Sequence, residues 1–185
     1  MAMLLFLADG FEEIEALGTL DLLRRAQIEV QTCAMGQSLE VRGAHELAVM
    51  ADGLAKDAPD EENVDGVILP GGMGGAAALA ESALVRKWIQ RMDEMGRWVC
   101  AICAAPALVL PRAGVLRERM ATCYPAPELT AALGRNYVYR AVVVSENLIT
   151  AAGPGCFGAF ARAIVKCVRG EQVAHEVFSA ALMEG

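Results

Sequence analysis

Basic and histidine side chains are scarce in this 185-residue sequence. It has 16 lysine and arginine residues against 23 acidic ones, a formal net charge of −7, and two histidines. The basic residues form no cluster, which argues against nucleic acid or an anionic membrane as a partner. His, Cys and Asp residues do not occur at ligand-like spacing, so we expect no metal site. Small molecules and proteins remain as partners.

Long hydrophobic runs are also absent. The longest uncharged apolar run, Val99 to Pro111, has 13 residues and contains Pro106, whereas a helix that crosses a bilayer needs about 20. The first residues, MAMLLFLADGFEE, lack the basic segment and cleavage site of a signal peptide. We therefore expect a cytoplasmic protein. In that compartment six cysteines are expected to be free thiols: Cys33, Cys100, Cys103, Cys123, Cys156 and Cys167.

Apolar residues are abundant, at 55% of the chain, and the length suits a single domain over residues 1–185. Short apolar runs alternate with segments at helical spacing. This pattern predicts an α/β fold, a doubly wound and mostly parallel sheet flanked by helices. The predicted strands are 1–7, 28–34, 64–69, 97–102, 120–123, 137–144 and 148–151, and the predicted helices are 12–25, 82–95, 156–168 and 172–182. Residues 36–50 are interpreted as an irregular hairpin and 55–63 as an acidic loop.

The stretch WVCAICAAP, residues 98–106, contains two cysteines three residues apart. Cys103 lies at the carboxyl end of a predicted strand, before a helix that opens with small residues and Pro106. Ligands of α/β sheets bind at this edge, where helix amides point outward. We therefore predict a reactive, exposed thiol with a pKa below the free value of about 8.5; the alternative is a buried small hydrophobe. Cys100 lies about 10 Å away on an extended strand, too far for a disulfide, and is interpreted as packing.

A second motif, GFEEIE at residues 10–15, also follows a predicted strand and so lies at the same edge. Glu12 and Glu15 are one helical turn apart and are expected to share a face, with Glu13 pointing elsewhere. These acids could simply stabilise the helix N-terminus. If burial keeps one carboxyl protonated, it can instead donate to the cysteine sulfur, and the pair then shares one proton.

Glycines close two further predicted strands. In LPGG, residues 69–72, the Gly72 amide can approach a ligand closely and form an oxyanion hole with the Ala104 amide. A phosphate loop is excluded because no Gly-Lys-Ser/Thr follows. GPGCFG, residues 153–158, spells a dinucleotide motif, but the residues after it leave no room for a second strand with its ribose-binding acid. We therefore expect no nucleotide cofactor.

Together GFEEIE, LPGG and AICAAP, with the GPG of 153–155, resemble the ThiJ/PfpI superfamily, particularly its Parkinson-associated protein deglycase branch. The resemblance spans nearly the whole chain. It implies a flavodoxin-like fold of the class I glutamine amidotransferase-like type, and a homodimer. It also implies that Cys103 is the reactive cysteine, that Glu15 is a protonated glutamic acid, and that Gly72 and Ala104 are the backbone donors.

One position departs from this resemblance. Several members place a histidine before a proline near the cysteine, whereas this chain reads ATCYP, with Tyr124 there. Tyrosine, with a pKa of about 10, is a poor base at neutral pH, which argues against a Cys-His-acid hydrolase. Tyr124, Pro154 and His45 are expected to line the site, His45 from a segment near the implied dimer interface; a purely structural His45 is the alternative. His175 is interpreted as a surface or helix-packing residue.

The resemblance implies a cofactor-free glyoxalase or deglycase-type stress protein. In that hypothesis the Cys103 thiolate adds to the aldehyde of a small dicarbonyl such as methylglyoxal, and Glu15 moves the proton. A second hypothesis is a redox sensor or chaperone that uses an oxidisable cysteine. The third is a peptidase or amidase, which would need a histidine from elsewhere.

Overall fold

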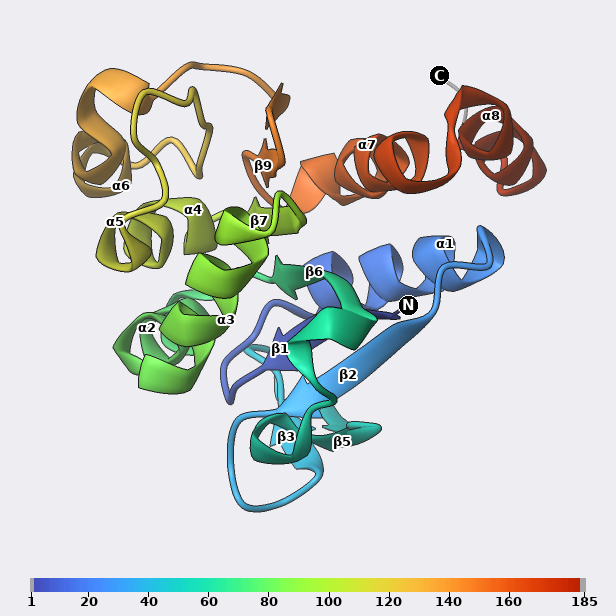
Figure 1. Ribbon diagram of the computed structural model, residues 1–185, viewed down its shortest axis with the longest axis horizontal. Helices are drawn as coiled ribbons and strands as arrows, with labels where there is room; N and C mark the ends of the chain where they lie inside the picture. Colours follow the sequence, from blue (N-terminus) through green and yellow to red (C-terminus); the bar gives the residue numbers. More distant parts are fainter. Residues whose placement is uncertain (1, 184–185) are drawn as a thin grey trace.

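The computed structural model describes residues 2–183, which form a seven-stranded sheet and a separate two-stranded hairpin (Figure 1). The sheet has the order β5-β2-β1-β6-β7-β9-β8, and its pairings are parallel except for β8 with β9. The predicted mostly parallel α/β sheet is therefore confirmed. The strands are β1 Ala2–Leu7, β2 Val30–Ala34, β3 Glu40–Arg42, β4 Ala48–Met50, β5 Gly53–Leu54, β6 Val64–Leu69, β7 Trp98–Ile102, β8 Val142–Ser145 and β9 Leu148–Ala151.

Helices cover both faces of the sheet: α1, α7 and α8 lie on one side and α2 to α6 on the other (Figure 1). They are α1 Thr19–Arg25, α2 Met73–Glu81, α3 Ala83–Glu94, α4 Ala105–Leu108, α5 Leu110–Ala113, α6 Pro127–Leu133, α7 Phe157–Arg169 and α8 Glu171–Ala180. A π-helical turn, η1 Ile14–Gly18, precedes α1, and single 3-10 turns are η2 Ala55–Asp57, η3 Glu61–Asn63, η4 Gly134–Asn136 and η5 Pro154–Cys156. Across residues 2–183, every helix falls short of the length and apolarity that a bilayer crossing requires.

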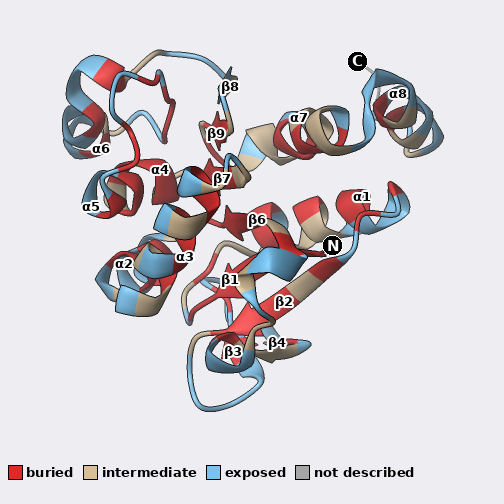
Figure 2. Ribbon diagram, viewed as in Figure 1, coloured by how far each residue is buried: buried red, intermediate tan, exposed pale blue. Residues whose placement is uncertain are grey.

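The central strand β1 shows why this sheet is covered on both faces. All six of its residues are buried (Figure 2). Leu4 and Phe6 belong to the core beneath α2 to α6, while Met3, Leu5 and Leu7 belong to the core beneath α1, α7 and α8. Successive side chains of a strand point to opposite faces, so a continuous apolar run supplies both cores at once.

Several predicted elements differ from the structure. The predicted strand 120–123 is wrong, because Ala121 forms only an isolated bridge with Tyr137. The predicted strand 137–144 is replaced by the shorter β8. Helices α2 and α6 were not predicted. The glycines that open α2 suggested a break in the chain, but Ala76 and Leu79 bury its inner face against the core. Tertiary packing, more than local propensity, stabilises short helices of this kind.

Candidate active site

Cys103 occupies the sharp turn between β7 and α4. Its backbone has φ +65°, a left-handed conformation that costs a residue with a side chain about 1–3 kcal/mol. Two backbone hydrogen bonds hold the turn: Cys103 N–H donates to the Ala151 carbonyl at 2.9 Å, and Tyr124 N–H donates to the Cys103 carbonyl at 2.8 Å. The thiol is half-buried, whereas Cys100 is fully buried and all six cysteines are free. The predictions of free thiols and of a packing role for Cys100 are confirmed.

Glu15 approaches the same sulfur from η1. Its side chain is buried, with 1% of the residue exposed. Its Oε2 accepts a hydrogen bond from Gly71 N–H at 2.8 Å, and the Cys103 sulfur lies close by, since a Cβ on Gly71 would meet Oε2 and come within 3.1 Å of the sulfur. Oε1 is buried without a partner. A π-helical turn is rare and occurs often at functional sites; here it carries the carboxyl that faces the sulfur.

The expectation that Glu12 shares a face with Glu15 is wrong. Glu12 and Glu13 both contact His45, while Glu15 turns inward to Gly71 and the thiol. The reason is that the helical segment begins at Ile14 with π geometry, so the spacing of an ordinary α-helix does not apply across residues 12–15.

The carboxyl and the thiol titrate as a pair. Burial raises the pKa of Glu15 to about 7, aided by the charge of Glu12 and opposed by hydrogen bonds from Cys103 and Gly71. Burial, followed by the charge of Glu15, raises the pKa of the Cys103 thiol to about 12, although the amides of Ala104 and Gly72 lower it. The predicted depression of the thiol pKa is therefore wrong beside an ionised Glu15, because burial and the neighbouring charge outweigh the helix amides.

These two pKa values mean that the pair holds a single proton over a wide pH range. When the carboxyl carries that proton, the sulfur is a thiolate. When the thiol carries it, the carboxylate is ionised. The thiolate form has the nucleophile and the proton donor side by side, and two backbone amides face the sulfur.

Two consecutive glycines make this close approach possible. A Cβ atom on Gly71 would lie 2.6 Å from the Cys103 Cβ and would also meet the Glu15 carboxyl. Gly72 has φ +81°, and a Cβ there would clash with the Gly10 carbonyl and lie 2.7 Å from the Glu12 nitrogen. Gly71 was missed by sequence reasoning; the doubled glycine after a buried strand was the signal that could have found it.

Replacing Gly72 by alanine is expected to destabilise the fold by about 3–5 kcal/mol, because left-handed strain and a backbone clash coincide there. Gly114→Ala is the matched control: Gly114 has φ +72° but nothing within 4 Å of its Cβ position, so strain alone should cost about 1–2 kcal/mol. Urea unfolding followed by circular dichroism measures both. Equal losses for the two variants would contradict a tight fit at Gly72.

The Cys103 thiol opens into a pocket of about 390 Å³. Tyr124 and Pro154, which were expected to line the site, do so, but His45 does not. The complete lining is Glu12, Gly72, Met73, Cys103, Ala104, Tyr124, Ala126, Glu128, Leu129 and Pro154. The contributions of Met73 and of α6 were missed, because neither helix α2 nor helix α6 was predicted.

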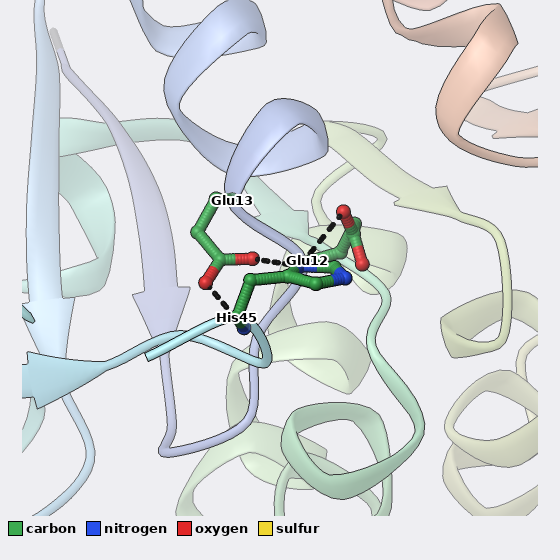
Figure 3. Close-up of side chains that lie close together, drawn as sticks. All are labelled: Glu12, Glu13 and His45. Atoms are coloured by element: carbon green, nitrogen blue, oxygen red, sulfur yellow. Dashed lines mark hydrogen bonds and ion pairs between the residues drawn. The ribbon is translucent and has the colours of Figure 1, made fainter. Parts of the chain in front are cut away.

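His45 lies beside the pocket in a cluster with Glu12 and Glu13 (Figure 3). Its Nδ1 is 2.7 Å from Glu13 Oε2 and 3.7 Å from Glu12 Oε1, and its backbone N–H donates to Glu13 Oε1 at 2.6 Å. The hydrogen bond to Glu13 and the charge of Glu12 raise the pKa of His45. Burial would raise the pKa of Glu13, but the bonds from His45 lower it overall.

The Glu12, Glu13 and His45 cluster is the one group within residues 2–183 whose ligand atoms lie close enough to hold a metal ion, all within 4.8 Å of one another. His45 already hydrogen-bonds to Glu13 and lies within ion-pair distance of Glu12, and the absence of a metal remains a prediction. The second histidine, His175, is exposed on α8 and lies outside the pocket lining.

Comparison with known proteins adds independent information. The model of the DJ-1/PfpI family matches residues 1–167. Protein DJ-1 homolog B of Arabidopsis thaliana is 37% identical over 96% of this chain, which spans only 40% of that protein's length. Protein dj-1beta of Drosophila melanogaster is 37% identical, with 94% of this chain and 92% of the relative covered. The glutathione-independent glyoxalase DJR-1.2 of Caenorhabditis elegans is 31% identical, with 92% and 90% covered.

Solved structures agree with these relatives. The crystal structure of Drosophila DJ-1beta superposes with a TM-score of 0.92 and 32% identity, covering all of both chains. A Toxoplasma gondii DJ-1 described as oxidized superposes with a TM-score of 0.93 and 29% identity, covering 100% of this chain and 99% of its own. Both the sequence and the backbone of this chain therefore have close counterparts of nearly the same length.

Proposed function

Because this chain belongs to the DJ-1/PfpI family, we propose that it is a glyoxalase or deglycase-type stress enzyme with Cys103 as its nucleophile. The observation that carries this proposal is the buried Glu15 carboxyl beside the Cys103 thiol, which opens into a pocket. The relative that is named a glutathione-independent glyoxalase supports it. The substrate class is small reactive dicarbonyls, such as methylglyoxal, or their adducts.

The proposed reaction begins with addition to the aldehyde. The Cys103 thiolate forms a C–S bond, the carbonyl electron pair moves to oxygen, and the amides of Gly72 and Ala104 stabilise the resulting negative charge. The Glu15 carboxyl donates its proton to that oxygen, which gives a hemithioacetal. The pair began with one proton, so Glu15 is then a carboxylate and can act as a base.

The second stage moves hydrogen within the substrate. Glu15 removes the proton from the former aldehyde carbon and returns it to the neighbouring carbonyl carbon, while the hydroxyl proton moves from the first oxygen to the second, so one carbon is oxidised and the other reduced. The product is a thioester of lactate on Cys103. Water attacks this thioester, the C–S bond breaks, and lactate leaves with the thiolate restored. Since the oxidation and reduction balance within the substrate, no external redox partner takes part.

Lactate formation from methylglyoxal in glutathione-free buffer tests this proposal. We expect many lactate molecules per protein chain, with the first-order dependence on enzyme that turnover requires. Less than one lactate per chain would indicate modification of the protein instead of catalysis, and would contradict the proposed activity.

A second candidate is redox sensing through the same thiol. The half-buried Cys103 lies beside a buried Glu15 oxygen that has no partner, and a protonated carboxyl there could hydrogen-bond to a sulfinate. One solved relative is described as oxidized. Mild peroxide is expected to add two oxygen atoms to Cys103 before other cysteines react, as measured by peptide mass. Oxidation no more sensitive at Cys103 than at Cys33 or Cys123 would count against this role.

The peptidase or amidase alternative gains no support from the site. Tyr124 lines the pocket where a histidine would be needed, and within residues 2–183 neither histidine is among the lining residues.

We also propose the homodimer implied by the family. Large apolar side chains of the β3–β4 hairpin region, Leu47 and Met50, are exposed in the single chain, and such residues favour burial against a partner. Sedimentation at twice the chain mass of 19.6 kDa is expected. A monomer at micromolar concentration would contradict this.

A further inference from the structure

The pocket around Cys103 carries acidic side chains and no basic one among its described lining residues. Glu12 contributes one carboxylate from the segment before η1, and Glu128 contributes another from the first turn of α6. Among residues 2–183, Glu128 takes part in none of the ion pairs. Its charge favours the N-terminus of α6, and the same charge also acts on whatever enters the pocket.

The surroundings of Glu12 do not cancel its charge. Its carboxylate lies 3.7 Å from His45, but His45 bonds more closely to Glu13, at 2.7 Å (Figure 3). Even a protonated His45 would be shared between two carboxylates, which leaves this cluster with a net negative charge. Glu13 is also fixed in place, because its side chain packs against Gly43, where a Cβ would lie 2.6 Å from the Glu13 Cγ.

The pocket therefore combines groups that favour opposite charges. At the sulfur, the amides of Gly72 and Ala104 favour a developing oxyanion. In the same lining, the carboxylates of Glu12 and Glu128 repel an anionic group, and Met73, Leu129 and Tyr124 offer apolar contact. We propose that this pocket selects electrophiles that carry a cationic group, and that it discriminates against carboxylate-bearing ones. The consequence for substrates rests on the proposed function: the charge preference of the pocket favours carbonyl compounds that carry an amine or guanidinium group over acidic ones such as glyoxylate.

Matched methanethiosulfonate probes test the charge preference without any turnover. The trimethylammonioethyl and sulfonatoethyl reagents differ in the sign of the group at their far end. In each reaction the Cys103 thiolate attacks the sulfenyl sulfur, a mixed disulfide forms, and methanesulfinate leaves. The rate at Cys103, located by peptide mass, is divided by the rate for 2-mercaptoethanol with the same reagent. We expect the cationic probe to be favoured by about tenfold at low salt, and less at 1 M salt.

Charge-neutralising variants assign the effect to the pocket. Glu128→Gln is expected to reduce the preference by about threefold, and the Glu12→Gln, Glu128→Gln double variant to remove most of it. Glu62→Gln is the matched control, because Glu62 is exposed on η3, outside the Cys103 pocket, and the substitution changes the net charge equally. It should leave the preference unchanged. Circular dichroism confirms that each variant is folded.

Two results would overturn the inference: a normalised ratio near one, or a ratio that Glu62→Gln changes as much as Glu128→Gln does. The outcome is separable from the proposed enzyme activity. Charge preference without lactate formation would reject the glyoxalase proposal and keep the inference. Lactate formation without charge preference would do the reverse.

Discussion

Replacing Cys103 by alanine is expected to lower lactate formation from methylglyoxal by about 10³-fold or more, to the uncatalysed background, because the C–S bond that begins the reaction cannot form. Alanine occupies less space than cysteine at a half-buried position, so the variant should fold, and its left-handed backbone is retained by the hydrogen bonds to Ala151 and Tyr124. The measurement is lactate produced per chain over time in glutathione-free buffer.

Two other half-buried cysteines provide the controls. Cys156 and Cys167 have exposures of the same class as Cys103 but lie outside its pocket. Their alanine variants should retain at least about half of the wild-type rate, since neither side chain lines the pocket. If the Cys103 variant forms lactate as fast as the wild type, the nucleophile has been assigned wrongly and the proposed mechanism fails.

The second large effect concerns Glu15. Substitution by glutamine preserves shape but removes the group that donates and accepts the proton, and is expected to lower kcat/KM by about 10²–10³-fold. In Glu15→Gln the side-chain amide would still have an oxygen that can accept from Gly71 N–H at the position of Oε2. Loss of activity therefore reports on proton transfer more than on packing. A glutamine variant with wild-type kcat/KM would exclude Glu15 from the chemistry.

The pH dependence of Cys103 alkylation shows which atom of the pair ionises first. Because the pKa of Glu15 is about 7 and that of the Cys103 thiol about 12, the shared proton lies mainly on the thiol above pH 7, so wild-type alkylation by iodoacetamide should stay slow until well above pH 7. In Glu15→Gln the neighbouring negative charge is gone, so the midpoint of alkylation should move downward. A midpoint that moves upward instead would mean that a neutral Glu15 had been stabilising the thiolate.

Stability gives an independent check on the same carboxyl. Its pKa is raised from 4.5 in the unfolded reference to about 7 in the folded chain, so the folded state binds the proton more tightly. The stabilisation from a protonated Glu15 is thus complete below pH 4.5 and is lost as the pH rises toward 7. At pH 8 the glutamine variant, which never ionises, should be more stable than wild type in thermal unfolding. A variant that loses activity while gaining stability would confirm that the buried carboxyl serves function.

The sequence alone determined that the sheet is mostly parallel and that Cys103 lies at the end of one of its strands. Continuous apolar runs such as AMLLFL, residues 2–7, supply side chains to two cores at once, so they predict strands buried on both faces. Cys103 was found because it ends such a run before small residues and a proline. Parallel strands bring their carboxyl ends to one edge of the sheet, so the same rule predicted that GFEEIE and LPGG lie near the thiol.

Only the tertiary structure decided how the thiol and the carboxyl ionise, and it alone gives the physical reason why Glu15, which the resemblance had indicated, meets the sulfur. From residue spacing, Glu12 and Glu15 were equivalent, and a π-helical turn separated them by turning Glu15 inward and leaving Glu12 to His45. The sign of the thiol pKa shift was mispredicted for a related reason. A helix N-terminus can be read from sequence, but the burial that opposes it depends on chain segments far apart in sequence. A pKa depends on burial and on nearby charges, and both are set by all the residues that surround the group in space. Spacing along the chain shows only the neighbours that are close in sequence.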